Sequence, residues 1–331
     1  MIASIQRPRY KVLINPFGGQ GSAARLFETA CRPILEAADC TLDVQITERS
    51  GHAVDIAREI DIEAYDAILC CSGDGVPHEV FNGLAKRDDA MKALKTIAVG
   101  QLPGGSGNAM CWNLTGTGDP SAATLSIIKS TPKPMDLVSI TQGDQRFLSF
   151  LSQSFGIIAE VDLGTEDLRW MGGARFTYGL MQRIWRQAVY PCDLAVKIAI
   201  NDKEVIREHY RQHEAQGALE GEKEIPELQF GAVNSELPDD WELIHQPNMG
   251  NFYAGNVRST VSPFFPSAFQ ALSAITKWWP VASTVIRLTR GRQTHRCPGC
   301  PPVRISFPHR YRTTACSIWS ALPVTSAVGK L

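Results

Sequence analysis

Asp74 is the residue of this sequence best placed to do chemistry. It lies between Gly73 and Gly75, directly after the apolar run 67–71, and an apolar helical period then resumes with Pro77 in its first turn. A glycine turn between a strand and a helix presents backbone N–H groups to an anion. A carboxylate in that turn can hold Mg²⁺ against phosphates or accept a proton from an attacking hydroxyl. An Asp-Gly turn without chemistry is the alternative.

Two further glycine-rich stretches, 18–21 and 104–107, also follow short apolar runs, at 12–14 and 96–99. Three such loops after three strands, one of them bearing an acid, favour a polyphosphate cradle over a single turn.

The first glycine stretch also fits the dinucleotide pattern Gly19-x-Gly21-x-x-Ala24, which keeps an NAD-dependent oxidoreductase open as an alternative. No Gly-Lys-Ser/Thr follows this stretch, so it is not a P-loop.

The elements that must position these loops alternate between strand and helix. We predict strands at 11–14, 42–46, 67–71 and 96–99, with helices around 26–35, kinked at Pro33, and 54–60. This alternation predicts an α/β N-terminal domain with a doubly wound, mostly parallel sheet, whose carboxyl-end loops form one ligand crevice.

The pattern changes near residue 135, where the alternation stops. Strand-like runs cover 136–140, 146–162, 194–200, 203–207, 228–233 and 251–254, and a helical period covers 163–186. We therefore predict three parts: a nucleotide-binding domain at 1–138, a mainly antiparallel β-sandwich domain at 139–257 with a polar insert at 208–227, and a tail at 258–331.

Composition narrows the class of protein. Apolar residues make up 44% of the 331 residues, charged residues 20%, and the formal net charge is −1, so nothing suggests a nucleic-acid partner. Nine cysteines in an uneven arrangement indicate a reducing compartment, and no stretch reads as a membrane-spanning helix. The sequence leaves the oligomeric state open.

Cys297 and Cys300 form half of a zinc pattern without a second half, so no metal site is assigned.

Four motifs together resemble the diacylglycerol kinase catalytic domain superfamily, and within it the sphingosine, or sphingoid long-chain base, kinases. They are NPFGGQG at 15–21, TERSGHA at 47–53, SGDGVPHEVFNG at 72–83 and LPGGSGN at 102–108. Ser72, His78-Glu79 and the run FGIIAEVDLGTEDLRWMGGARFTYG at 155–179 carry the narrower resemblance.

The resemblance implies a role for individual residues. Asp74 would be the general base on the lipid's primary hydroxyl, Asp162 would receive the sphingoid amine, and Ser152 would lie near the lipid head, with Ser72, Gly73 and Gly75 beside the substrate. The implied ATP contacts are Asn15, Pro16, Phe17, Gly18, Gly19, Thr47, Glu48, Arg49, Ser50, Gly51, Glu79, Gly105, Ser106, Gly107, Arg169 and Arg175.

From these residues we predict an ATP- and Mg²⁺-dependent kinase of a sphingoid base, cytoplasmic and peripherally attached to membranes through exposed aromatics such as Trp185. A diacylglycerol or ceramide kinase of the same superfamily is the nearest alternative, but its substrate has no amine, so Asp162 would lack a partner. A relative that binds lipid or nucleotide without catalysis is another.

The tail departs from the family pattern. No Asp or Glu follows Glu242, whereas ten Lys and Arg residues do, and the expected Asp-Gly-x-x-Asp and Asp-Gly-Glu runs are missing. A basic tail that binds anionic lipid is one interpretation. The other is divergence through an altered reading frame or splice junction, which predicts a poorly ordered tail after about Arg258 and weak or no kinase activity.

Overall fold

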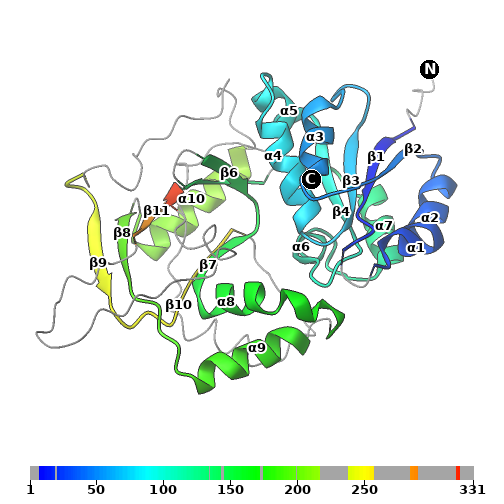
Figure 1. Cartoon of the computed structure of the whole chain (residues 1–331). Coiled ribbons are helices and arrows are strands. Elements are labelled where there is room, and N and C mark those ends of the chain that lie inside the picture. The colour runs from blue at the N-terminus through cyan, green and yellow to red at the C-terminus, as the bar shows by residue number, and fades with distance from the viewer. Residues whose placement is uncertain are drawn as a thin grey trace, which may run out of the picture.

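The structure is a computed structural model that describes residues 7–18, 21–133, 135–142, 145–171, 174–198, 200–216 and 238–256, with two further strands at 284–289 and 318–320. Figure 1 shows a parallel sheet with its helices on the right and antiparallel strands on the left. The two parts follow one another along the chain.

The first part is built on four parallel strands in the order β2-β1-β3-β4. Their bounds are β1 Arg9–Ile14, β2 Thr41–Ile46, β3 Ala67–Ser72 and β4 Ala98–Pro103. All residues of β3 and β4 are buried, as expected for central strands covered on both faces. The predicted α/β domain with a parallel sheet is confirmed. The fourth strand begins later than predicted, because Thr96 ends a helix.

Helices cover both faces of this sheet. One layer packs on Leu13, Ile68 and Cys70, and the other packs on Val12, Ile14 and Leu69, so alternate strand residues feed two cores. The first layer comprises α3 His52–Glu59, α4 Gly75–Ala85 and α5 Ala90–Thr96. The second comprises α1 Ala23–Leu26, η1 Phe27–Cys31, α2 Arg32–Ala37 and α7 Pro120–Lys129.

The predicted kink at Pro33 takes the form of a π-helical turn, η1, directly before the proline-bearing helix α2. Proline has no N–H to donate, and its ring crowds the preceding turn. The wider π-helical turn before Pro33 relieves this crowding.

The strand order reverses between β1 and β3, because the chain passes from β1 to β2 on one side and then returns to β3 on the other. The loops after these two strands lie side by side, and the N–H of Asn15 donates to the carbonyl of Cys71 (3.2 Å). In open α/β sheets this switch point is where ligands bind. The loops that hold Asn15 and Asp74 therefore flank the expected crevice.

The strands of the second part pair antiparallel, in a large sheet of order β6-β5-β12-β11-β8-β9 and a small sheet of β7 and β10. The large sheet comprises β5 Val138–Gln142, β6 Gln145–Ser149, β8 Cys192–Ile198, β9 Glu242–Gln246, β11 Thr284–Thr289 and β12 Ile318–Ser320. The small sheet comprises β7 Ser152–Gly156 and β10 Asn251–Gly255. One apolar cluster joins Ile140 and Val196 of the large sheet to Ala254 of the small one.

The strand predicted to run to Asp162 is wrong beyond residue 156. Gly156 has φ +99°, a value that favours glycine, and helix α8 (Ile157–Gly164) begins directly after it. The helix predicted at 163–186 is broken into a 3₁₀ segment, η2 (Glu166–Met171), and helix α9 (Ala174–Trp185). Asp162 therefore lies on a helix and not at the end of a strand.

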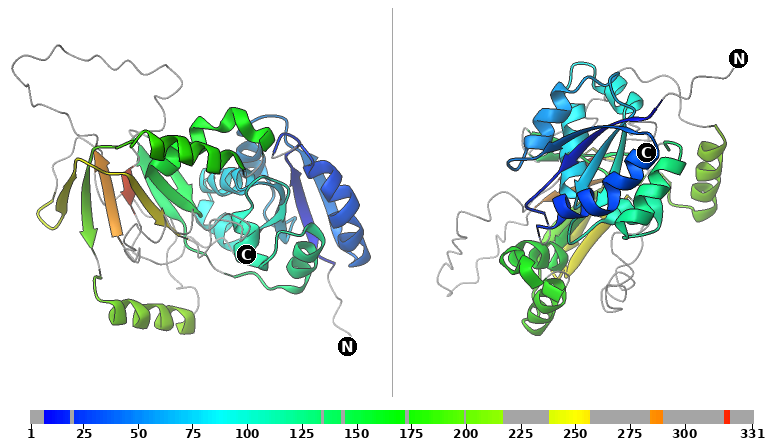
Figure 2. Two further views of the ribbon diagram at one scale, coloured as in Figure 1. Left: turned by 90° about the horizontal axis from the view of Figure 1, so that it is seen from below. Right: turned by 90° about the vertical axis from the view of Figure 1, so that its right-hand side faces the viewer.

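The strand predicted at 203–207 is also wrong, because helix α10 (Lys203–Gln216) occupies this position and the first half of the predicted insert. The Asp202 carboxylate accepts hydrogen bonds from the N–H groups of Glu204 and Val205, and Arg207 pairs with Glu204 along the helix. In each view of Figure 2, α10 lies apart from the parallel sheet and from the large antiparallel sheet. The strand was predicted because the adjacent apolar residues Val205 and Ile206 give no helical period.

Several predictions fall wholly or partly outside the described residues. These are the remainder of the polar insert, the strand at 228–233, the zinc half-pattern at Cys297 and Cys300, and the tail apart from two strands. Those two strands, β11 and β12, pair with β8 and β5 respectively, and the order of the tail as a whole stays a prediction.

Candidate functional site

Asp74 lies at the N-terminal end of α4, and its carboxylate reaches across to the start of another helix, α6 (Ala109–Thr115). The backbone N–H of Ala109 donates to one carboxylate oxygen and that of Met110 to the other, each at 2.9 Å. Burial raises the pKa of Asp74 above its ordinary value, although these two hydrogen bonds act in the opposite direction. A partly desolvated carboxylate with a raised pKa is a suitable proton acceptor.

The glycine loops after β3 and β4 touch one another beside Asp74. A Cβ added to Gly105 would lie 2.3 Å from the Cα of Gly73, and one added to Gly73 would lie 3.1 Å from the carbonyl oxygen of Gly107. No other residue type fits such an approach of two backbones. The contact between the two loops therefore brings together the predicted substrate and ATP positions, which include Ser72, Gly75 and Ser106.

The loop after β1 closes on itself. The side-chain oxygen of Asn15 accepts a hydrogen bond from the N–H of Phe17 (2.9 Å), and the N–H of Gly21 donates to the carbonyl of Gly18 (3.0 Å). Phe17 is exposed, and Gly19 lies outside the described residues. This Asx turn keeps the loop compact at the switch point beside the Asp74 loop.

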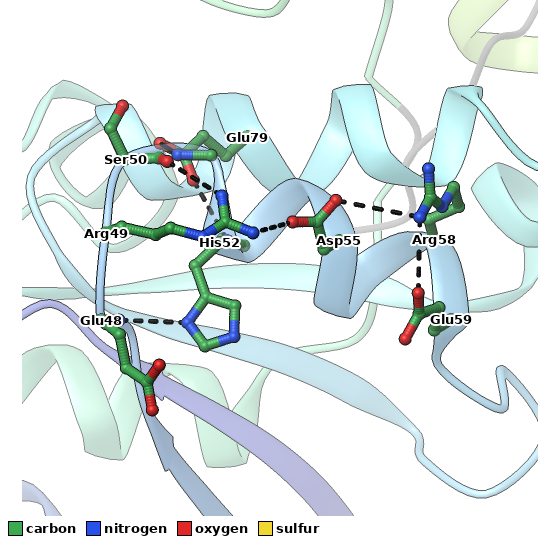
Figure 3. Close-up of polar contacts among 10 residues, drawn as sticks. Glu48, Arg49, Ser50, His52, Asp55, Arg58, Glu59 and Glu79 are labelled. Atoms are coloured by element: carbon green, nitrogen blue, oxygen red, sulfur yellow. Dashed lines mark hydrogen bonds and ion pairs between the residues drawn. The ribbon is translucent and has the colours of Figure 1, made fainter.

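Glu79 fixes the loop before α3. One of its carboxylate oxygens accepts from the N–H of Gly51 (2.9 Å) and the other from the N–H of Ala53 (3.1 Å), as Figure 3 shows. The N–H of Glu48 donates to Nδ1 of His52 (3.0 Å), and Arg49 pairs with Asp55. The predicted ATP positions Thr47 to Gly51 thus form one loop that α4 holds in place, and the role of Glu79 toward ATP itself remains a prediction.

The second-part residues form a separate cluster on α8 and α9. Arg175 donates to the Asp162 carboxylate (3.0 Å) and to the carbonyl of Thr165 (3.1 Å), and its guanidinium lies over the ring of Phe176. The predicted amine receptor and a predicted nucleotide arginine are thus paired with each other. The side chain of Arg175 is 9% exposed and that of Asp162 is 62% exposed.

For two further predicted residues, Arg169 and Ser152, the structure gives only their place in the fold. Arg169 belongs to η2, but its side chain is outside the part of the chain that the structure describes. Ser152 begins β7 and is half-buried opposite Gly255 of β10. Their roles remain predictions.

Sequence reasoning missed Asn82, which joins the two parts of the molecule. Its side-chain nitrogen donates to the carbonyl of Leu148 in β6 (2.8 Å), and its oxygen accepts from the N–H of the same residue (2.9 Å). Asn82 is 6% exposed, and beside it the rings of Phe81 and Phe150 pack with tilted planes and their centroids 5.6 Å apart. An asparagine on the buried face of an amphipathic helix was the available signal.

His78 lies one turn before Asn82, and burial lowers its pKa. No group of three metal-binding side chains converges within the described ranges, and no helix described there is long and apolar enough to cross a membrane.

Comparison with known proteins agrees with the motifs. Residues 9–140 match the family described as diacylglycerol kinase catalytic domain. The chain is 47% identical over 213 residues to "Sphingoid long chain base kinase 5" of Saccharomyces cerevisiae, covering 63% of this chain and 31% of the relative. It is 38% identical over 204 residues to "Sphingoid long chain base kinase 4" of Schizosaccharomyces pombe, covering 62% and 44%.

"Sphingosine kinase 1" of Homo sapiens is 37% identical over 202 residues, covering 58% of this chain and 52% of the human protein. The chain thus spans about a third to a half of the length of these curated relatives. A crystal structure of a diacylglycerol kinase from Bacillus anthracis shares the fold, with 17% identity, a TM-score of 0.51, and coverage of 86% of this chain and 88% of that one.

Residues 9–140 are therefore similar to the diacylglycerol kinase catalytic domain family, and over part of its length the chain is similar to sphingoid long chain base and sphingosine kinases.

Proposed function

We propose that this chain is an ATP-dependent kinase that phosphorylates the primary hydroxyl of a sphingoid base. The observation that carries the proposal is the position of Asp74, half-buried between two touching glycine loops at the switch point of the sheet. The names of the curated relatives support the substrate class.

In the proposed reaction Asp74 accepts the hydroxyl proton as the hydroxyl oxygen attacks the γ-phosphorus. The bond between that phosphorus and the β–γ bridging oxygen breaks, so the products are ADP and a sphingoid base 1-phosphate. The free lone pair of a carboxylate oxygen takes the proton, since each oxygen already accepts one backbone hydrogen bond.

Mg²⁺ would neutralise charge on the phosphates when bound. The described residues offer no converging set of three ligands, and both oxygens of Asp74 already accept hydrogen bonds. We therefore expect the ion to be held chiefly by phosphate oxygens and assign no residue to it.

The lipid would reach the site from a membrane surface. Tyr178, Met181 and Trp185 share one face of α9 at i, i+3 and i+7, and they are exposed, Trp185 to 87%. An exposed apolar helix face with an aromatic of this kind suits the interfacial region of a bilayer. We propose this face as the peripheral membrane contact.

The second part, residues 139–257, would then act as the lipid-binding domain. The apolar cluster that joins β5 and β8 to β10 supports a β-sandwich, and its interior would take the alkyl chain. Asp162, which is exposed on α8, would meet the amine of the lipid.

Transfer of radiolabel from ATP to sphingosine, diacylglycerol and ceramide tests the proposal. We expect label in sphingosine alone, and label in diacylglycerol or ceramide instead would assign the chain to the nearest alternative. A thermal-shift panel of ATP–Mg²⁺, NAD and sphingosine checks the other classes: a shift with NAD alone would favour an oxidoreductase, and binding without transfer would indicate a non-catalytic relative.

A further inference from the structure

Gln101 is a polar side chain inside the core of the parallel sheet. It lies on β4 and is 0% exposed, and all other residues of that strand are buried too. A buried amide needs partners for both its oxygen and its nitrogen, because an unmet polar group in the core is costly. The contacts of Gln101 therefore show what this side chain does.

The oxygen of Gln101 completes the start of α6. The first N–H groups of a helix have no partner inside it. In α6 the N–H groups of Ala109 and Met110 donate to Asp74, and the N–H of Cys111 donates to the side-chain oxygen of Gln101 (2.7 Å). Asp74 and Gln101 thus share one helix terminus between them.

The nitrogen of Gln101 holds the loop that carries Asp74. It donates to the carbonyl of Ser72 (3.1 Å), which also accepts from the N–H of Gly104 (3.1 Å). The orientation of the amide is therefore fixed, with its oxygen facing a donor and its nitrogen facing an acceptor. Neither Glu, which lacks the donor when ionised, nor an apolar residue reproduces this arrangement.

We propose that Gln101 is a positioning residue for Asp74, holding the base's loop through Ser72 and the helix start that Asp74 caps through Cys111. The inference rests on the proposed function, in which Asp74 is the general base. Gln101 would touch neither ATP nor lipid.

The electrostatic environment of Asp74 agrees with this role. Gln101 lowers the pKa of Asp74, and the other influences on that pKa are burial and the two backbone donors, none of which is charged. The neighbouring thiol of Cys111 has its pKa raised to about 11 and stays neutral in the assay range, while burial lowers the pKa of His78 on α4. Removing the amide should therefore raise the pKa of Asp74.

The test compares Gln101→Met, which keeps the chain length but loses the amide, with the wild-type protein. We expect kcat to fall about tenfold with an unchanged KM for ATP. The acid limb of kcat/KM should move to higher pH, because the Gln101 amide lowers the pKa of Asp74. The direction follows because the ionised base is then reached only at higher pH.

Thr124→Val is the matched control, since Thr124 is also 0% exposed and donates to the carbonyl of Pro120 (2.7 Å) on α7, which packs against the other side of the sheet. It should leave the acid limb in place. If Gln101→Met does not fold, Gln101→Asn, which shortens the side chain by one methylene, replaces it in the same assays.

A second readout does not need activity. In protein labelled with ¹³C at the Asp carboxyl carbon, the Asp74 signal is assigned by its loss in Asp74→Asn, and its titration should move upward in Gln101→Met. The proposal would be overturned if Gln101→Met lowered the plateau of kcat/KM but left both the acid limb and the Asp74 titration unmoved. Absence of phosphate transfer by the wild-type chain would instead count against the proposed function, and the carboxyl titration would still test Gln101.

Discussion

Asp74 accepts hydrogen bonds from backbone groups of a neighbouring helix, whereas a side-chain ion pair between Asp162 and Arg175 links α8 to α9, a helix that also carries an exposed apolar face. The first region is half-buried and fixed by hydrogen bonds to backbone groups, which depend little on side-chain identity. The second depends on the identity of two side chains, the buried Arg175 and the exposed Asp162. Under the proposed function, the Asp74 region is preorganised for chemistry, while the region of α8 and α9 is free to vary with the lipid and the surface that it meets.

The largest effect should come from Asp74→Asn, which removes the proposed proton acceptor. We expect kcat to fall on the order of 10² to 10⁴-fold. The amide would also place an N–H₂ group toward Ala109 or Met110, so ATP binding and thermal stability must be measured in the same preparation.

Glu79→Gln provides the matched control, because Glu79 also caps a helix with both oxygens. It should disturb α3 in the same manner and lower kcat by no more than about tenfold. Equal losses in the two variants would mean that Asp74 acts only as a cap.

The next effect concerns the contact between the two parts. Asn82→Leu leaves the buried N–H and carbonyl of Leu148 without their partner, which should cost about 2 to 4 kcal/mol of unfolding free energy. Urea unfolding measures this loss. Asn82→Asp, which keeps an acceptor for the N–H, should be destabilised as well, since its carboxylate faces the Leu148 carbonyl. Wild-type stability in both variants would show that the contact is dispensable.

Gly105→Ala tests how closely the two glycine loops must approach. The added Cβ would lie 2.3 Å from Gly73, so the backbones must separate, at a cost of about 1 to 3 kcal/mol and with a weaker affinity for ATP. Gly250→Ala is the control, because no atom lies within 4 Å of the Cβ position there. If the Gly105 variant bound ATP as the wild type does, the loops would be less constrained than described.

Asp162→Asn should act on the lipid side alone. Asp162 is largely exposed, so the loss of its charge should raise the KM for sphingosine only about fivefold to tenfold and leave the KM for ATP unchanged. Glu160→Gln, on the same helix, should change neither value, because the Glu160 side chain pairs with Arg183 and has no predicted contact with the lipid. A matching rise in both constants for Asp162→Asn would assign the residue to structure instead.

The smallest effect is expected for Trp185→Ala. Binding to liposomes that contain anionic lipid should weaken a few-fold, with no change in the phosphorylation of sphingosine presented in detergent. Leu125→Ala, an exposed apolar residue on α7, should leave liposome binding intact. Cosedimentation with vesicles measures both, and unchanged binding of the Trp185 variant would remove this face as the contact.

The features that the sequence predicted well depend on neighbouring residues. The turn around Asp74, the glycine loops and the parallel strands follow from local periodicity and turn chemistry. The contacts of Glu79 with Gly51 and of Asn82 with Leu148 join residues far apart in the chain, and periodicity contains no information on such pairs.

Helix α10 was missed because its charged pairs and Asp202 cap stabilise it without a wide apolar stripe. Asp162 was misplaced because a strand and a helix look alike in a short apolar run.

Asn82 also bears on the order in which the chain can fold during its synthesis. The four strands of the parallel sheet are complete once Pro103 has been made, but Leu148, which satisfies both polar groups of the Asn82 side chain, comes much later. Until then an amide on α4 and the ring of Phe81 lack the partners they have in the finished molecule. A fragment ending at residue 138 would keep that unfinished surface permanently, so the first part of the molecule should be expressed with β6 attached.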